Sequence, residues 1–140
     1  MSLNTSVLQH TILLLETALV RYREEDPESL EVEILRHAIL KEYELIQELA
    51  HGLIRKALRE FVPGIPRLHA TPVKELLRLA ARYDLLTLDE VERWFAYRDQ
   101  RNATAHEYGE RLVLEAMERL VDFVRDSRNL ALRLEEMSRR

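Results

Sequence analysis

The 140-residue chain contains no cysteine, and it has only three glycines and four prolines. Without cysteine the chain cannot form a disulfide, a zinc–thiolate site or a thiol nucleophile. Scarce glycine and proline argue against a β-sandwich or a barrel, which need many turns. Leucine, glutamate, arginine and alanine dominate instead, and all four favour helix. The composition therefore predicts an all-α protein with a real core, since 46% of the residues are hydrophobic.

Long apolar runs and a strong positive charge are also missing. No apolar stretch approaches the roughly 18 residues that a membrane-spanning helix needs, and no basic run precedes an apolar stretch at the start of the chain, as it would in a signal peptide. We therefore expect a cytoplasmic protein with no membrane partner. The net charge is −4, whereas proteins that coat long nucleic acids usually carry a basic face. A net negative charge still allows a small site where a few arginines contact one phosphate.

Apolar residues at helical spacing predict five helices. The expected ranges are 5–22, 27–61, 71–86, a fourth helix starting at Leu88, and 110–137, with a loop at 62–70. Asp26 before Pro27 and Thr71 before Pro72 are typical pairs of an N-cap and a first-turn proline. The segment 87–90, Thr-Leu-Asp-Glu, is typical of a capping box. The short connections favour a single helical domain over residues 1–140, folded as an antiparallel bundle of four or five helices.

The same spacing predicts the side chains that face the core. In the first two helices these are Val7, Leu8, Ile12, Leu15, Leu19, Val20, Leu30, Ile34, Ile39, Ile46, Leu49, Leu53 and Leu58. In the last helix they are Leu112, Ala116, Leu120, Phe123 and Val124, and the fourth helix carries the apolar and aromatic residues Val91, Trp94, Phe95 and Tyr97. For Trp94 and Phe95 we favour the core or a dimer interface over base stacking.

The segment 97–108, YRDQRNATAHEY, concentrates arginine, acidic, amide, histidine and tyrosine side chains behind an amphipathic helix. If the segment is helical, with about 100° between successive residues, one face holds Arg98, Asp99, Asn102 and His106. Arg101 then lies roughly 140° away from His106. For both to contact one ligand, the helix must end near His106 or a partner must complete the site. Gly109 is consistent with such a helix end.

These residue types suit chemistry on a phosphodiester. Histidine titrates near neutrality, so His106 can serve as general base or acid, and Arg101 offers a fixed fork of donors to phosphate oxygens. Asn102 could orient the imidazole, and Asp99 could hold an arginine or fix the histidine tautomer. Together they could support RNA cleavage without metal, with the ribose 2′-hydroxyl attacking its own phosphate. On composition alone such a polar stripe is more often a solvated or interface face, and spacing alone does not make it catalytic.

Arg101 to Tyr108 match the Arg-x-x-x-x-His-x-Tyr signature of HepT-like HEPN (higher eukaryotes and prokaryotes nucleotide-binding) proteins. The chain more closely resembles the branch of nucleotidyltransferase substrate-binding proteins. The residues that carry this resemblance are Leu76-Leu77-Arg78-Leu79-Ala80-Ala81, Asp84-Leu85-Leu86, Asp89-Glu90, Trp94 and Arg98-Asp99-Gln100-Arg101-Asn102 to Tyr108. The detailed match covers about residues 71–110, and the helical outline extends it to nearly the whole chain.

The resemblance implies a helical bundle that forms a homodimer or a higher oligomer around the motif, with a minimal nucleotidyltransferase as protein partner. In HepT-like toxins the arginine and histidine support ribonuclease activity, and the partner neutralises the toxin by adding AMP to the tyrosine. Carried over, Arg101 would bind and polarise phosphate, His106 would be the acid/base, and Tyr108 would accept AMP. The supporting positions would be Arg98, Asp99 and Asn102. Two departures are Asp84, where glycine is more usual, and a long loop at 63–72.

Three functions remain open from the sequence. The first is a metal-independent endoribonuclease, the toxin of a toxin–antitoxin pair. The second is a non-catalytic subunit that presents a substrate or nucleotide to a separately encoded nucleotidyltransferase. The third is a helical dimerisation module with the motif as its interface. The scattered histidines show no metal-ligand spacing and the chain has no glycine-rich phosphate loop, so we expect neither a metal nor a cofactor.

Overall fold

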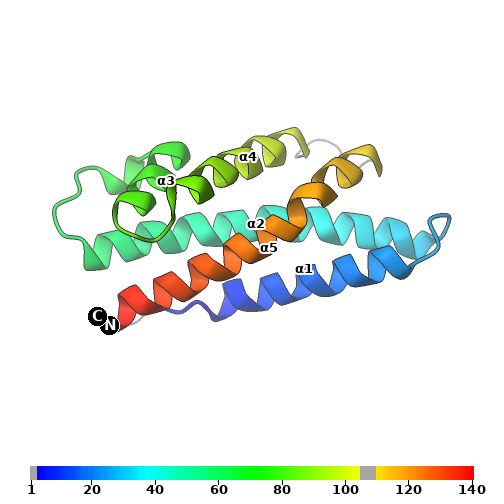
Figure 1. Ribbon diagram of the computed structural model, residues 1–140, viewed down its shortest axis with the longest axis horizontal. Helices are drawn as coiled ribbons and strands as arrows, with labels where there is room; N and C mark the ends of the chain where they lie inside the picture. The colour runs from blue at the N-terminus through cyan, green and yellow to red at the C-terminus, as the bar shows by residue number, and fades with distance from the viewer. Residues whose placement is uncertain (1–2, 105–109) are drawn as a thin grey trace.

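The structure is a computed structural model that describes residues 3–104 and 110–140, and the side chains of all of these except 101–104 and 110–113. Helices run back and forth along one long axis, and both chain ends lie at the same end of the bundle (Figure 1). Within the described ranges there is no strand, and no helix is long and apolar enough to cross a membrane. The elements are α1 (Ser6–Glu24), α2 (Leu30–Phe61), the 3-10 turn η1 (Leu68–Ala70), α3 (Val73–Arg82), α4 (Leu88–Thr104) and α5 (Glu110–Arg139). The predicted all-α bundle is confirmed.

Two predicted helix starts illustrate how capping side chains decide a boundary. The capping box before α4 is confirmed, because Thr87 N donates to Glu90 Oε1 at 2.7 Å and Glu90 N donates to Thr87 Oγ1 at 3.1 Å. The predicted cap at Asp26 is wrong. Its carboxylate accepts from Glu28 N at 3.0 Å and forms a turn, and Ser29 caps α2 instead by accepting from Val32 N at 3.2 Å.

Glu90 is nearly fully buried and does more than cap α4. Arg133 of α5 donates through Nη1 to the same Glu90 Oε1, and through Nη1 also to the carbonyl oxygen of Leu85 at 3.3 Å. One carboxylate therefore joins the first turn of α4 to the second half of α5.

Four of the side chains predicted to face the core are exposed: Val7, Val20, Leu30 and Ile34. Leu30 is the clearest case, because 72% of its surface is exposed. The adjacent residues Val32 and Leu35 of α2 are buried instead. Helical spacing finds an apolar stripe, but where two apolar rows lie side by side it does not say which row packs against a neighbour.

Asp84 ends α3 in a left-handed backbone conformation, with φ at 67°. Leu85 N donates to the carbonyl oxygen of Ala80 at 2.8 Å, which is the long bond that closes a helix whose last position is left-handed. A side chain at such a position is strained, and glycine is not. The departure from glycine noted in the sequence therefore falls where the backbone favours glycine most.

We expect Asp84→Gly to raise the free energy of unfolding by about 0.5–1 kcal/mol, because relief of the left-handed strain exceeds the extra entropy of glycine in the unfolded chain. Urea denaturation followed by circular dichroism measures the change. Asp84→Ala keeps the Cβ atom and removes only the carboxylate. If Asp84→Ala stabilises the protein as much as Asp84→Gly does, the strain explanation is wrong.

Candidate functional site

The last turns of α4 carry the polar segment predicted as the functional centre. The main chain of Arg98, Asp99, Arg101 and Asn102 lies within α4, which is the condition under which the sequence places Arg98, Asp99 and Asn102 on one helix face. The side chains of Arg101 and Asn102 lie outside the described residues. So do His106 and Tyr108, which belong to residues 105–109 between α4 and α5. The predicted helix end near His106 therefore also falls outside them.

Four aromatic side chains hold this end of α4 against the rest of the bundle. Tyr43 comes from α2, Trp94 and Tyr97 from α4, and Phe123 from α5, and all four are fully or almost fully buried. Their rings meet edge to face, with centroids 4.7 Å apart for Tyr43 and Phe123 and 4.9 Å apart for Tyr97 and Phe123. Such contacts add to the stabilisation from burial alone. Trp94 is thus a core residue, as predicted, and it is not available for base stacking.

A buried carboxylate next to these rings ties α4 to α5. Asp126 is fully buried, and Arg93 donates to both of its oxygens, from Nε to Oδ2 at 2.8 Å and from Nη2 to Oδ1 at 3.0 Å. The Tyr97 hydroxyl donates to Asp126 Oδ2 at 2.6 Å. Burial and then this hydrogen bond raise the pKa of Tyr97 well above its ordinary value, so the hydroxyl stays a neutral donor. The hydrogen bond to Asp126 likewise raises the pKa of Arg93.

A second hydrogen bond fixes α4 one residue before Arg101. The Tyr43 hydroxyl, from α2, donates to Gln100 Oε1 at 3.1 Å and lies 3.4 Å from the carbonyl oxygen of Tyr97. Burial raises the pKa of Tyr43, so this hydroxyl also remains protonated. The main chain that carries Arg101 is therefore held by α2 on one side and by α5 on the other. No local pattern in the sequence indicates this support. Tyr43 lies 54 residues before Tyr97, and Asp126 lies 29 residues after it.

We expect Tyr43→Phe to lower the free energy of unfolding by about 1 kcal/mol, the usual net contribution of one intramolecular hydrogen bond. The ring is retained, so the aromatic contact with Phe123 survives. The measurement is urea denaturation, with Tyr22→Phe on α1 as the matched control. Equal losses in the two variants would show that the bond to Gln100 contributes nothing specific.

Asp99 lies on the surface beside α3. Its described partner is Lys74, with Nζ 3.1 Å from Asp99 Oδ1, and the two side chains are 47% and 63% exposed. An exposed pair of this kind contributes at most about 1 kcal/mol. Lys74 and Arg78 also lie over the ring of Phe95, at 5.4 and 5.2 Å from its centroid. The described partner of Asp99 is thus a lysine of α3, whereas the sequence suggested an arginine or the histidine of the motif.

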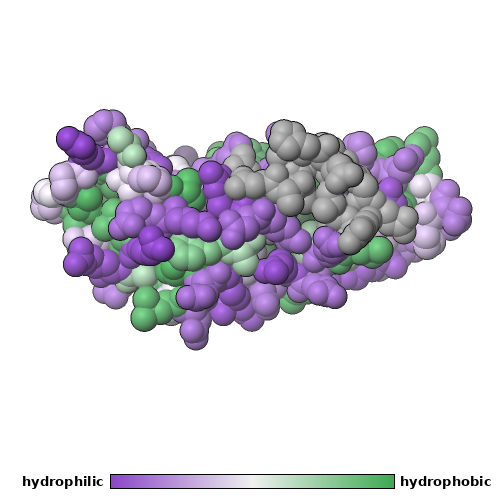
Figure 2. All heavy atoms as spheres, turned by 90° about the horizontal axis from the view of Figure 1, so that it is seen from above, coloured by the Kyte–Doolittle hydropathy of each residue, from purple (hydrophilic) through white to green (hydrophobic). Residues whose placement is uncertain are grey.

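The surface around this site is largely hydrophilic. Figure 2 views the molecule from above, where hydrophilic side chains cover most of the face beside the grey, undescribed region. Within residues 3–104 and 110–140, no three histidine, aspartate or glutamate side chains gather closely enough to hold a metal ion. The polar groups described at this end of the bundle are arginine, lysine, amide and phenol groups together with the carboxylates of Asp99 and Asp126.

The family model described as "Nucleotidyltransferase substrate binding protein like" matches residues 3–136, so the chain belongs to that family. This confirms the family expected from the motif.

Individual relatives agree with this assignment. The chain is 25% identical over 129 residues to "Probable ribonuclease HepT" of Haemophilus influenzae, covering 89% of this chain and 87% of that protein. The solved structure of HI0074 from the same species, described as the fold of a substrate binding domain of a nucleotidyltransferase, superposes with a TM-score of 0.81 at 25% identity and covers 94% of this chain and 98% of that one. A crystal structure of a Thermus thermophilus protein reaches a TM-score of 0.60 at 28% identity, with 86% of this chain and 98% of that one covered.

Proposed function

We propose that this protein is a HepT-type toxin, a metal-independent endoribonuclease that a minimal nucleotidyltransferase neutralises by adding AMP to Tyr108. The observation that carries the proposal is the complete Arg101, His106 and Tyr108 set in a chain that is similar over 89% of its length to a protein named probable ribonuclease HepT. The support of α4 by Tyr43 and Asp126 is consistent with it, because a catalytic arginine needs a rigid helix to hold it in place.

In the proposed reaction Arg101 binds a nonbridging phosphate oxygen and stabilises the charge that develops there. His106 takes the proton of the 2′-hydroxyl, whose oxygen attacks the phosphorus as the bond to the 5′-oxygen breaks. Water supplies the proton that the 5′-oxygen needs to leave, and the imidazolium of His106 returns its proton to the resulting hydroxide. The products are a 2′,3′-cyclic phosphate and a free 5′-hydroxyl, and no metal is required.

AMP on Tyr108 would block this site, because it places a bulky anion two residues from His106. The proposal therefore predicts that a minimal nucleotidyltransferase with ATP labels the wild-type protein and leaves Tyr108→Phe unlabelled. Labelled protein should no longer cleave RNA. We also propose that the active form is a homodimer or a higher oligomer in which a second copy helps to complete the site, and light scattering would test this.

A second function is favoured by a different observation. HI0074, which superposes with this chain at a TM-score of 0.81, is described as a substrate binding domain of a nucleotidyltransferase. A non-catalytic subunit of that kind would bind a nucleotide or another substrate and cut nothing. Incubation of purified protein with RNA in the presence of EDTA separates the two. Cleavage supports the ribonuclease, and intact RNA together with nucleotide binding supports the subunit.

A further inference from the structure

A basic pocket lies where the loop after α2 folds back over the last turns of that helix. The cavity has a volume of about 230 Å³. Its basic lining residues are Arg55 and Arg59 of α2 and Arg67 and His69 of the loop. Val62 and Ile65 form part of its apolar wall. In Figure 1 this loop lies at the left end of the bundle, away from the last turn of α4. It is the long loop noted as a departure from the family pattern.

The positive charge of this pocket is not balanced by nearby acids in the part of the chain that the structure describes. No acidic residue lines the cavity, and among the ion pairs of the described ranges none involves these three arginines or His69. Arg55 and Arg59 are one helical turn apart, a spacing at which like charges repel. A bound anion would remove that repulsion.

One arginine of the pocket is already held in place. Arg55 Nη1 donates to the carbonyl oxygens of Leu68 at 2.6 Å and of Thr71 at 3.1 Å, which fixes both the loop and the guanidinium. Those bonds use a single nitrogen, and a guanidinium has five N–H donors. The remaining donors can therefore serve a ligand without any rearrangement of the loop.

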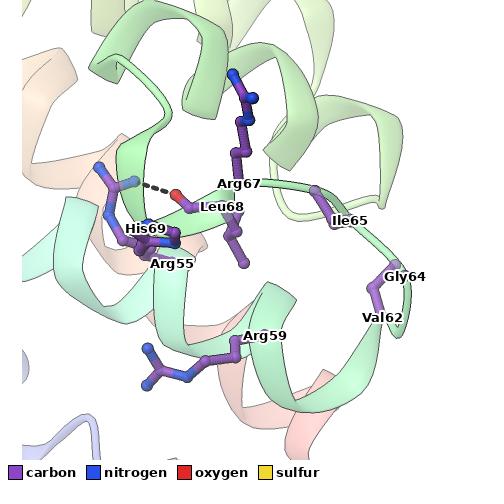
Figure 3. A pocket seen from close by; sticks show the side chains of 8 residues that line it. All are labelled: Arg55, Arg59, Val62, Gly64, Ile65, Arg67, Leu68 and His69. Carbon is purple, nitrogen blue, oxygen red and sulfur yellow. Dashed lines mark hydrogen bonds between the residues drawn. The ribbon is translucent and has the colours of Figure 1, made fainter.

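The basic side chains of the pocket come from two segments that lie next to each other, the end of α2 and the loop after it. Figure 3 shows Arg55 and His69 side by side on one side of the loop and Arg59 on the next turn of α2. Arg67 extends away from them on the other side. Its backbone is left-handed, with φ at 52°, and its carbonyl oxygen accepts from Ala70 N at 3.0 Å and from Thr71 Oγ1 at 3.0 Å. Arg67 thus shapes the turn and adds charge at the rim.

We propose that this pocket binds a phosphate group through Arg55, Arg59 and His69. Arginine donors match phosphate oxygens in geometry and charge. Pockets for whole drug-sized ligands usually exceed about 300 Å³, so this cavity suits a phosphate and its nearest atoms rather than a complete nucleotide. The phosphate can belong to an RNA backbone or to a small phosphorylated molecule. The proposal does not depend on RNA cleavage at His106.

The first test uses inorganic phosphate as the probe on the full-length protein, with chloride at the same ionic strength as the reference. Amide resonances of residues 55–71 should shift on titration. The double variant Arg59→Gln/His69→Gln should weaken phosphate binding at least about tenfold, the effect of losing one charge-assisted hydrogen bond. Both side chains are exposed, so the fold should be retained.

The control is Arg21→Gln on α1, which makes the same kind of charge change at an exposed position outside the pocket. It should leave phosphate affinity unchanged. Equal weakening in both variants, or shifts spread over the whole surface, would overturn the proposal.

A six-nucleotide RNA with 2′-O-methyl groups, which cannot be cleaved, identifies the source of the bound phosphate group. If its binding also weakens in the double variant, the pocket holds RNA, and if only phosphate binding weakens, the ligand is a small molecule.

Discussion

His106→Ala is expected to reduce RNA cleavage by a factor of about 10²–10⁴, the usual contribution of a positioned general acid or base. The 2′-hydroxyl is a weak nucleophile until its proton is removed, and within the segment 97–108 only His106 titrates near neutrality. The measurement is the single-turnover rate on a labelled RNA in EDTA. The variant should still bind RNA, because the arginine that holds phosphate is unchanged.

Two further variants make this result specific. Arg101→Lys keeps the positive charge but loses the two-pronged donor geometry, so it should slow cleavage while retaining most of the binding. His10→Ala removes an exposed histidine of α1 and should cleave at the wild-type rate. Cleavage that survives in His106→Ala would point to a contaminating nuclease and would end the ribonuclease proposal, while leaving the phosphate pocket untouched.

Arg93→Met is expected to lower the free energy of unfolding by about 3 kcal/mol, the largest stability change that we predict. The substitution leaves Asp126 fully buried without its bidentate partner. The expected loss of about 3 kcal/mol lies at the low end of the range for broken buried ion pairs. The Arg93 side chain is 35% exposed, and Arg125 Nη2 lies 3.5 Å from Asp126 Oδ1 and still offers a positive charge to it. Urea denaturation with a constant m-value measures the effect.

A rescue experiment separates loss of the charge pair from loss of packing. Arg93→Met/Tyr97→Phe/Asp126→Leu removes the cation, the phenol and the carboxylate together, so that no polar group of this cluster is left without a partner. Replacing a whole buried ion network by apolar residues is often neutral. We therefore expect the triple variant to be more stable than Arg93→Met alone. If it is less stable, the contribution of this cluster lies in its shape rather than its charge.

Much of this fold can be predicted from local chemistry. Helix content follows from composition, and the start of α4 follows from Thr87 and Glu90, which act through bonds within one turn. The start of α2 was predicted wrongly because Asp26 and Ser29 are both good caps, and tertiary packing decides between them. The choice between apolar rows at Leu30 and Val32 depends on the position of neighbouring helices, which no local pattern contains.

The candidate site also has features that depend on local sequence and features that depend on tertiary packing. Its motif residues can be found in the sequence because Arg98 to Tyr108 are contiguous. Their support cannot be found there, since Tyr43, Arg93 and Asp126 come from three helices and look like ordinary core or surface residues. The basic pocket shows the same difficulty, because Arg55 and His69 become neighbours only when the loop folds back on α2.

The carboxylate of Glu90 has a consequence for how the molecule opens. It accepts from the main chain at the start of α4 and from Arg133 of α5, so α4 cannot detach from α5 at this end without breaking the ion pair of a carboxylate that also caps α4. The two helices should therefore exchange their amide hydrogens as one cooperative unit. In such a unit, the amides in the first turn of α4 are protected from exchange to the same degree as those in the second half of α5. The start of α4, which would otherwise fray, then stays closed until α5 unfolds.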